Sequence, residues 1–418
     1  MHDFHYRNND LYCEDVPVRD IIERHGTPLY IYSAKTLKNH FRAYGTAFSS
    51  IPHIISFAMK ANSNQAVLRL FAREGGGADI VSGGELYRAL AAGMDPRKII
   101  FAGVGKSEDE IRYALESDIL MFNVESPAEL RQIDAVAGRI GKKGPVAIRV
   151  NPDVDPKTHP YISTGMKEHK FGIGIETALD KYRMAMSLEH IEIVGIHQHI
   201  GSQLTDVTPY VDAVKRLLGL VEELKKIGID IRYVNIGGGL GITYEDEVPP
   251  QPKDLADAIG PLVKDLKCVL IMEPGRSLVG NAGIMATKVL YLKEGEGKRF
   301  VIVDAAMNDL IRPSLYQAYH LIQPVRKMDR QTFKADIVGP ICETSDFLAR
   351  DREIEECREG EALAVMSAGA YGFTMASNYN SRPRTAEVLV NGSEVHLVRE
   401  RETYEDLIRS EKLPDFLK

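Results

Sequence analysis

Short apolar segments recur through the middle of the chain, and most are followed by a stretch with helical periodicity. Eight of these segments are predicted as strands, and seven of them precede a helical stretch. Strands that are apolar along their whole length are typical of parallel sheets covered on both faces. The predicted strands are residues 54–60, 78–82, 99–102, 121–124, 146–150, 193–197, 233–236 and 269–272.

Two architectures accommodate eight βα units in about 250 residues, a (β/α)8 TIM barrel and an open doubly wound sheet. An open sheet gathers its functional side chains at one switch point, whereas polar residues here follow nearly all eight strands. We therefore expect an α/β fold built on a TIM barrel. Ser107 and Ser126 are predicted as N-caps of two of its helices, and 207–227 as its longest helix.

The pattern changes after about residue 285. Segments 289–293, 300–303, 335–338, 362–366 and 386–390 are strand-like and bounded by turns, and helical periodicity is scarce until 403–410. These segments predict a C-terminal β-sandwich or β-barrel-like domain. N-terminal strands, beginning with a hairpin at Asn8-Asn9, are expected to complete it. The expected domains are the barrel at 33–284 and the β domain at 1–32 and 285–418.

The composition limits the class of protein. The 418 residues are 44% hydrophobic, and the net charge is -7 with acids and bases interspersed, which argues against a nucleic-acid binder. No apolar segment approaches the ~20 residues that cross a bilayer, and the first ten residues lack a signal core. We therefore expect a cytoplasmic location. The four cysteines form no C-x-x-C pair, so no metal site is expected.

Lys60 follows the apolar residues of the first predicted strand, just before Ala61-Asn62. A lysine that loses contact with water has a lowered pKa and becomes a nucleophile towards aldehydes, including the aldehyde of pyridoxal phosphate. The alternative is a lysine that reaches the surface from a strand end, and for Lys60 taken alone this alternative is the commoner case.

Glycines and a carboxylate follow the last two predicted strands. Residues 237–241 contain four glycines, which suit either a phosphate-binding loop or a tight turn. Glu273 ends an apolar run and needs a cationic or donor partner if buried. That partner is either a protonated pyridine nitrogen or Arg276, in a structural ion pair.

Two histidines follow the sixth predicted strand. Alternation along a strand places His197 and His199 on the same face. They suit a zinc pair, for which no third ligand is obvious, or an imidazole packed against a flat cofactor ring. One of the two histidines could also be a satisfied core residue, while Ser202 nearby could donate to a phosphate.

An ordered set of motifs resembles the pyridoxal-phosphate-dependent group IV (fold type III) decarboxylases, and within them the diaminopimelate decarboxylase family. The resemblance spans almost the whole chain. The residues that carry it are 56–62, His199 to Ser202, Gly237 to Gly239, 273–276, 339–346, 369–372 and 377–384.

The resemblance implies roles for individual residues. The catalytic residues would be Lys60, which binds the cofactor covalently, His199, which stacks on its ring, and Cys342, which protonates the intermediate. The substrate would be bound by Arg276, Arg312, Tyr316, Glu343 and Tyr371. The cofactor, pyridoxal 5'-phosphate, would be bound by Lys60, Asp79, Arg149, His199, Ser202, Gly237, Gly238, Gly239, Glu273, Gly275, Arg276 and Tyr371.

The resemblance also implies a homodimer, in which Cys342 and Glu343 reach the active site from the partner subunit. The expected reaction converts meso-2,6-diaminopimelate to L-lysine and carbon dioxide, the final step of lysine biosynthesis. The chemistry agrees, because arginines suit a distal carboxylate and a glutamate a distal ammonium. Residues 158–170 are the candidate for a loop that closes over the site.

Three alternatives remain open at this stage. One is a decarboxylase of another basic amino acid or of a carboxylated polyamine, and the second is an amino-acid racemase on the same fold. The third is a non-catalytic carrier of pyridoxal phosphate. The β domain argues against the carrier, because carriers resemble the barrel alone.

Overall fold

The computed structural model describes residues 2–154 and 170–417. The predicted closing loop at 158–170 therefore lies outside the described residues except for Lys170. The chain forms two compact units. We name Lys38–Leu278 the barrel unit, and Met1–Leu37 together with Val279–Lys418 the β unit.

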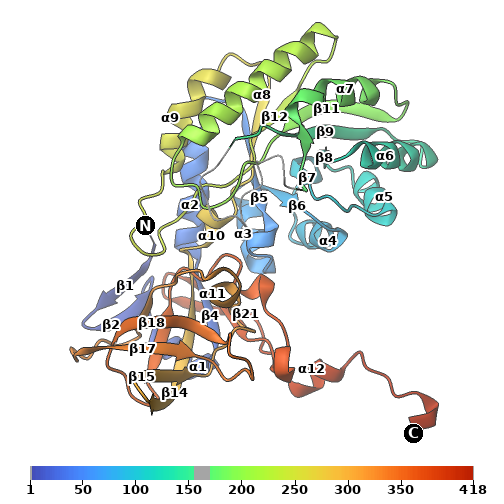
Figure 1. Cartoon of the computed structure of the whole chain (residues 1–418). Helices are drawn as coiled ribbons and strands as arrows, with labels where there is room; N and C mark the ends of the chain where they lie inside the picture. Colours follow the sequence, from blue (N-terminus) through green and yellow to red (C-terminus); the bar gives the residue numbers. More distant parts are fainter. Residues whose placement is uncertain (1, 155–169, 418) are drawn as a thin grey trace. The chain divides into compact units, whose positions relative to one another are not determined.

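The barrel unit contains a closed ring of eight parallel strands, which confirms the predicted TIM barrel (Figure 1). Each strand pairs with the next along the chain, and the last pairs with the first through Met272 and Ile55, so that no edge remains. The strands are β5 (His53–Ala58), β6 (Gly77–Ile80), β7 (Ile99–Phe101), β8 (Met121–Val124), β9 (Gly144–Asn151), β11 (Ile191–His197), β12 (Tyr233–Asn235) and β13 (Val269–Met272). The short β10 (Ile173–Gly174) adds to β9.

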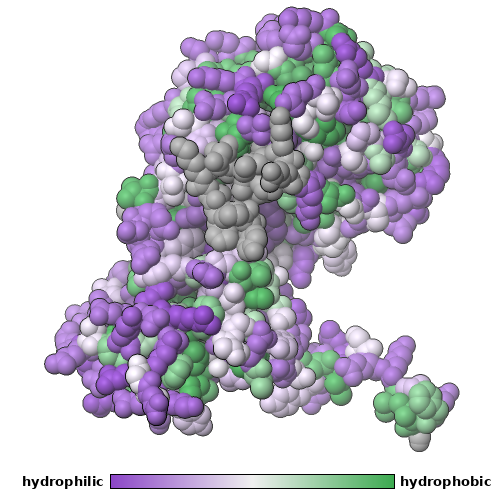
Figure 2. All heavy atoms as spheres, viewed as in Figure 1, coloured by the Kyte–Doolittle hydropathy of each residue, from purple (hydrophilic) through white to green (hydrophobic). Residues whose placement is uncertain are grey.

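Helices surround this ring. They are α2 (Ala34–Ala47), α3 (Gln65–Arg73), α4 (Gly83–Ala91), α5 (Glu108–Glu116), α6 (Pro127–Arg139), α7 (Ile175–Met186), α8 (Thr208–Lys226), α9 (Pro252–Val263) and α10 (Arg276–Val279). Ser107 caps α5 in a capping box, and Ser126 caps α6 ahead of a proline, as predicted. On the face seen in Figure 2, hydrophilic residues cover much of the surface of these helices.

The first barrel strand is shorter than predicted. β5 ends at Ala58, and Lys60 lies in the single 3-10 turn η1 (Met59–Ala61). The three residues between the strand and Asn62 form a tight turn and are not extended. The alternation of side chains along a strand therefore does not determine where the Lys60 side chain points.

The β unit is built on a second sheet that combines both ends of the chain. β4 (Leu29–Ser33) pairs with β14 (Gly283–Gly295) on one side and with β20 (Ala386–Asn391) on the other. Buried apolar side chains from these strands, among them Ile31, Ile284 and Val388, form a common core. The N-terminal segment is thus part of this core.

The remaining elements of the β unit extend this sheet or lie beside it. A hairpin of β1 (Phe4–Arg7) and β2 (Asp10–Cys13) turns at Asn8 and Asn9, as predicted, and both asparagines have positive φ angles. The other elements are β3 (Val16–Pro17), α1 (Val18–His25), β15 (Lys298–Val303), α11 (Arg312–Tyr316), β16 (Ile322–Pro324), β17 (Thr332–Val338), β18 (Phe347–Glu355), β19 (Ala362–Val365), β21 (Glu394–Arg399) and α12 (Tyr404–Ile408). No helix among the described residues is long and apolar enough to span a membrane.

Candidate active site

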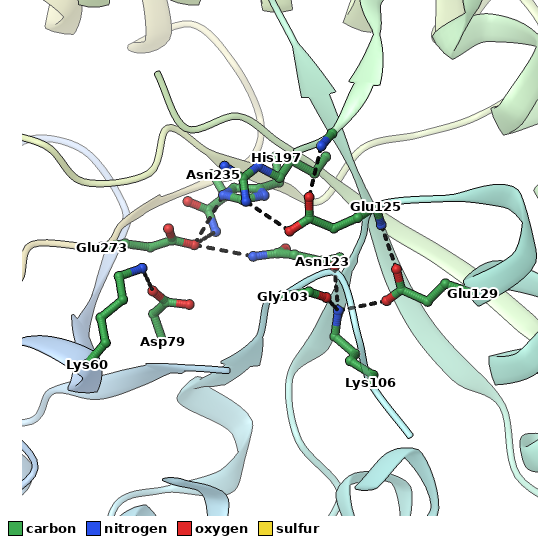
Figure 3. A network of polar contacts seen from close by, with 12 residues as sticks. Lys60, Asp79, Gly103, Lys106, Asn123, Glu125, Glu129, His197, Asn235 and Glu273 are labelled. Carbon is green, nitrogen blue, oxygen red and sulfur yellow. Dashed lines mark hydrogen bonds and ion pairs between the residues drawn. The ribbon is translucent and has the colours of Figure 1, made fainter. Parts of the chain in front are cut away.

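Polar side chains gather where the barrel strands end. Parallel strands of a closed barrel have their carboxyl ends at one rim, and this is the end where TIM-barrel sites form. Asn123 belongs to β8, His197 to β11 and Asn235 to β12, while Glu273 follows β13 directly. Figure 3 shows these side chains converging, with Lys60 and Asp79 beside them.

The amine of Lys60 lies 3.3 Å from Oδ2 of Asp79. The Lys60 side chain is 40% exposed, whereas that of Asp79 is 1% exposed. Of the two alternatives for Lys60, full withdrawal from water is therefore wrong: the side chain reaches partly into solvent and is held by a buried carboxylate. Burial, and then the nearby charge of Glu273, raise the pKa of Asp79 to about 7.

Glu273 is buried, and three side-chain nitrogens surround one of its oxygens. Its Oε1 accepts from Nδ2 of Asn235 at 2.7 Å and from Nδ2 of Asn123 at 3.2 Å, and Nε2 of His197 lies 3.3 Å away. Burial alone would raise the pKa of Glu273, but His197 and the charges around it outweigh burial and bring the pKa to about 2. The carboxylate is therefore ionised at neutral pH.

The other oxygen, Oε2 of Glu273, has no hydrogen-bond partner among the described residues. The alternative of an ion pair with Arg276 is wrong. The Arg276 guanidinium instead donates to the hydroxyl of Tyr244 at 2.6 Å and to Oγ of Ser202 at 3.1 and 3.3 Å. Glu273 thus has a negative charge and a free acceptor at the rim.

The two histidines lie in different surroundings. His197 ends β11 inside the barrel, whereas His199 follows the strand, so the predicted common face does not extend to it. Nδ1 of His199 accepts from the backbone N–H of Gly238 at 3.2 Å. Burial, with the positive charges of Lys60 and Arg149, holds the pKa of His199 well below its usual range, so its imidazole is neutral. Among the described residues no cluster of His, Cys, Asp or Glu side chains could hold a metal ion.

The glycine loop after β12 packs so closely that side chains do not fit. A Cβ on Gly238 would lie 2.0 Å from the carbonyl oxygen of Glu273, and one on Gly239 would lie 2.4 Å from that of Gly201. Gly237 and Gly239 also have positive φ angles. Only glycine therefore fits at these positions of the loop.

Arg149 is committed to a neighbouring carboxylate. It is buried, and its Nη1 donates to Oε1 of Glu125 at 2.8 Å. Oε2 of Glu125 accepts from the backbone N–H of Gly172 at 2.8 Å, and the Arg149 guanidinium lies over the ring of Phe171. Arg149 therefore ties the end of β9 to the residues after β8.

The other predicted site residues lie in the β unit. Arg312 is buried at the start of α11, and its Nη1 lies 2.9 Å from Nε2 of His320. Nδ1 of His320 lies 2.8 Å from the carbonyl oxygen of Met366, which can only accept. Nδ1 must therefore carry the proton and Nε2 accepts from Arg312. Tyr316, at the end of α11, is half-buried.

Cys342 and Glu343 are exposed on the loop before β18. The backbone N–H of Cys342 donates to Oδ1 of Asn380 at 2.8 Å, and hydrogen bonds from Ser345 and Tyr379 lower the pKa of Glu343. Oγ of Ser314 on α11 donates to the carbonyl oxygen of Ser345 at 2.6 Å. The β unit therefore brings α11 and the 341–346 loop together. Tyr371 lies elsewhere in this unit, with a φ of 56°.

The sequence analysis missed several residues of this rim. Asn123, Asn235 and the pair Lys106–Glu129 were not predicted as site residues. Asparagines at the ends of the fourth and seventh predicted strands were a usable signal, because polar residues at those positions face the functional end of a barrel.

Comparison with known proteins gives the family. Residues 34–280 match the family described as "Pyridoxal-dependent decarboxylase, pyridoxal binding domain". The diaminopimelate decarboxylase of Aquifex aeolicus is 55% identical over 404 residues, which are 96% of each chain. That of Pseudomonas aeruginosa is 54% identical over 413 residues, 99% of each chain.

This chain belongs to the diaminopimelate decarboxylase family. A solved structure of the M. jannaschii diaminopimelate decarboxylase in co-complex with L-lysine has a TM-score of 0.95 and 42% identity, and covers all of both chains. That of Helicobacter pylori complexed with L-lysine has a TM-score of 0.91 and 44% identity, covering 94% of this chain and 98% of that one.

The rim of this decarboxylase-family chain fits pyridoxal phosphate. An aldehyde needs an amine, and Lys60 has one at the rim. A protonated ring nitrogen needs an ionised acceptor, and the free Oε2 of Glu273 is one. A phosphate needs donors that approach closely, and the Arg276 guanidinium with the Ser202 hydroxyl meets that need beside a glycine loop that has no side chains.

Proposed function

We propose that this protein decarboxylates meso-2,6-diaminopimelate to L-lysine and carbon dioxide with pyridoxal 5'-phosphate as cofactor. The proposal rests on sequence identity: more than half of the residues are identical to those of diaminopimelate decarboxylases over almost the whole length of both chains. Co-complexes of related structures with L-lysine, the product of this reaction, support it.

When bound, pyridoxal phosphate accepts the electrons that the departing carboxylate leaves behind. Lys60 supplies the amine that holds the cofactor covalently. Ionised Glu273 keeps the ring nitrogen protonated, and neutral His199 presents its flat face to the ring. Asp79 would support Lys60, and Arg149 would support the strand ends that hold the cofactor.

The phosphate is held by backbone and side-chain donors. We assign this role to Ser202, to the glycine loop and to Arg276, with Tyr371 added on the family resemblance. The glycine members are Gly237, Gly238, Gly239 and Gly275. A guanidinium that already donates to Ser202 is positioned to share a phosphate oxygen with it.

The substrate's second amino-acid end requires a carboxylate site and an ammonium site. On the family resemblance we assign the distal carboxylate to Arg276, Arg312 and Tyr316, and the distal ammonium to Glu343. Glu343 suits this role because its lowered pKa keeps it ionised. Arg312 suits its role because His320 fixes the guanidinium plane. Lysine itself lacks this carboxylate and would give the charge of buried Arg312 no counter-charge from the substrate.

The proton that replaces the lost carboxylate must come from one face. We assign it to the thiol of Cys342, which is exposed and therefore available to a site completed by a second subunit. The homodimer, the contribution of the β unit to the substrate site and the cytoplasmic location belong to the same proposal.

The test is a product analysis of purified protein supplied with pyridoxal phosphate and meso-diaminopimelate. We expect one carbon dioxide for each L-lysine, and no release from L-lysine or L-ornithine. Release from lysine or ornithine at a comparable rate would make the protein a decarboxylase of basic amino acids. Inversion without carbon dioxide would make it a racemase, and cofactor binding with neither would make it a carrier.

A further inference from the structure

Among the lysines and arginines that the structure describes, Lys106 has the most deeply buried side chain of those that the predicted site does not use. It lies in the loop between β7 and α5, on the same rim as Glu273 (Figure 3). Its side chain is only 1% exposed. An ammonium taken out of water must be compensated fully, so its contacts show what the position requires.

All three donors of the Lys106 ammonium have acceptors. Nζ donates to the carbonyl oxygen of Gly103 at 2.8 Å, to that of Asn123 at 2.9 Å and to Oε1 of Glu129 at 2.6 Å. Gly103 follows β7 and Asn123 belongs to β8, so one ammonium joins the ends of two neighbouring barrel strands.

Glu129 binds both the Lys106 ammonium and the backbone that follows β8. Its Oε2 accepts from the backbone N–H of Glu125 at 2.7 Å. The carbonyl of Asn123 and the N–H of Glu125 are therefore both fixed, with one residue between them. The pair Lys106–Glu129 thus holds the backbone at the end of β8 on both sides of Val124.

The residue held in this way carries a donor of Glu273. The side chain of Asn123 is fully buried, and its Nδ2 donates to Oε1 of Glu273 at 3.2 Å. A shift of a few tenths of an ångström in the β8 backbone would break this bond, since it is already near the limit for a hydrogen bond. Glu273 would then lose a donor that fixes its rotation and its free Oε2.

We infer that Lys106 and Glu129 are positioning residues for the cofactor: they fix Asn123, which aims the free oxygen of Glu273 at the ring nitrogen. This inference rests on the proposed function. Its rival is a pair that only stabilises the barrel. Buried ion pairs are often replaceable by apolar residues at no cost in stability, so stability alone does not explain such a pair.

The test measures cofactor affinity and folding separately. Lys106→Met keeps the length of the side chain and removes its charge and donors. Lys142→Met is the matched control, because Nζ of Lys142 also donates to a carbonyl, that of Leu115, and to a carboxylate, that of Asp118, at 2.7 Å each but is 36% exposed. We would measure the Kd for pyridoxal phosphate, the visible circular dichroism of the bound cofactor and the Tm.

We expect Lys106→Met to raise the Kd about tenfold or more, as the loss of a hydrogen bond to a charged group does, and to change the dichroism band. Lys142→Met should change neither. In Lys106→Met the buried carboxylate of Glu129 loses its ammonium partner. The double variant Lys106→Met/Glu129→Gln removes that charge as well, and we expect it to recover Tm but not affinity for the cofactor. If Lys106→Met does not fold, the affinity is measured on the double variant instead.

A mutational cycle tests the path through Asn123. If Lys106 acts through Asn123, adding Lys106→Met to Asn123→Ala should raise the Kd little further. Three results would each overturn the inference. The first is a folded Lys106→Met variant that binds pyridoxal phosphate as tightly as wild type, and the second is a double variant that regains wild-type affinity. The third is a Lys106→Met/Asn123→Ala variant whose increase in Kd is the product of the two single increases. If the wild type itself takes up no cofactor, the proposed function fails instead.

Discussion

The buried carboxylate of Asp79 gives the barrel unit a stability that depends on pH in an unusual direction. Its pKa of about 7 in the folded chain exceeds the ordinary value of 3.8. Between these two pH values the folded state binds more protons than the unfolded state, so stability falls as pH rises. The effect should be complete by about pH 8.

The size of the effect follows from the same two values. A tenfold change in an equilibrium is about 1.4 kcal/mol, so the gap corresponds to up to about 4 kcal/mol. The amine of Lys60 lies 3.3 Å from Asp79 but is partly exposed. Because Lys60 keeps part of its hydration whether or not Asp79 is charged, its own contribution to the pH dependence should be small. Asp79→Asn replaces the carboxylate by a neutral group of the same shape and should remove this pH dependence.

Urea unfolding of the cofactor-free protein at pH 4 to 8 measures it. The stability of wild type minus that of Asp79→Asn should decline through this range by roughly 2 to 4 kcal/mol. Asp180→Asn, which changes a surface carboxylate with 69% side-chain exposure on α7, should give a nearly constant difference. A difference between wild type and Asp79→Asn that stayed level or increased with pH would refute the argument.

Three further predictions test other residues. Borohydride reduction should label the peptide of Lys60 and no other, and Lys60→Ala should lose the absorbance band of the bound cofactor. Gly238→Ala should cost more than about 2 kcal/mol in unfolding free energy, since its Cβ would lie 2.0 Å from a carbonyl oxygen, whereas Gly219→Ala on α8, with open space around it, should gain about 0.5–1 kcal/mol. Arg312→Ala should lower kcat/KM for diaminopimelate about 100-fold or more, and His320→Ala less than that; full activity of Arg312→Ala would contradict the distal-carboxylate assignment.

The barrel was predictable because its signal is local. Each strand is apolar through its length, and each following helix has its own start signal, such as the serine caps at Ser107 and Ser126. The place where a strand ends is less marked in the sequence. Lys60 continues an apolar run, yet the chain turns after Ala58, so its exposure could not be read from periodicity.

The partners of a buried charge were not predictable, because they come from distant parts of the chain. Asn123 and Asn235 lie 150 and 38 residues before Glu273. Arg276 lies only three residues after Glu273, and no local sequence signal shows that it binds Tyr244 and Ser202 and not Glu273. Only closure of the barrel brings β8, β12 and β13 around one carboxylate. The resemblance supplied the role of Glu273 but not the side chains that maintain it.

Glu273 and Asp79 are two buried carboxylates on one rim, and their different neighbours give them different protonation states. Both are nearly inaccessible, and burial raises the pKa of each. Glu273 has His197 beside the oxygen that accepts from two amides, and the interaction with His197 together with the nearby charge of Lys60 outweighs burial. Asp79 has only the partly hydrated Lys60 on Oδ2, while its buried Oδ1 has no partner among the described residues. The negative charge is therefore kept at Glu273, whereas the raised pKa of Asp79 lets this carboxyl bind a proton near neutral pH beside the amine of Lys60.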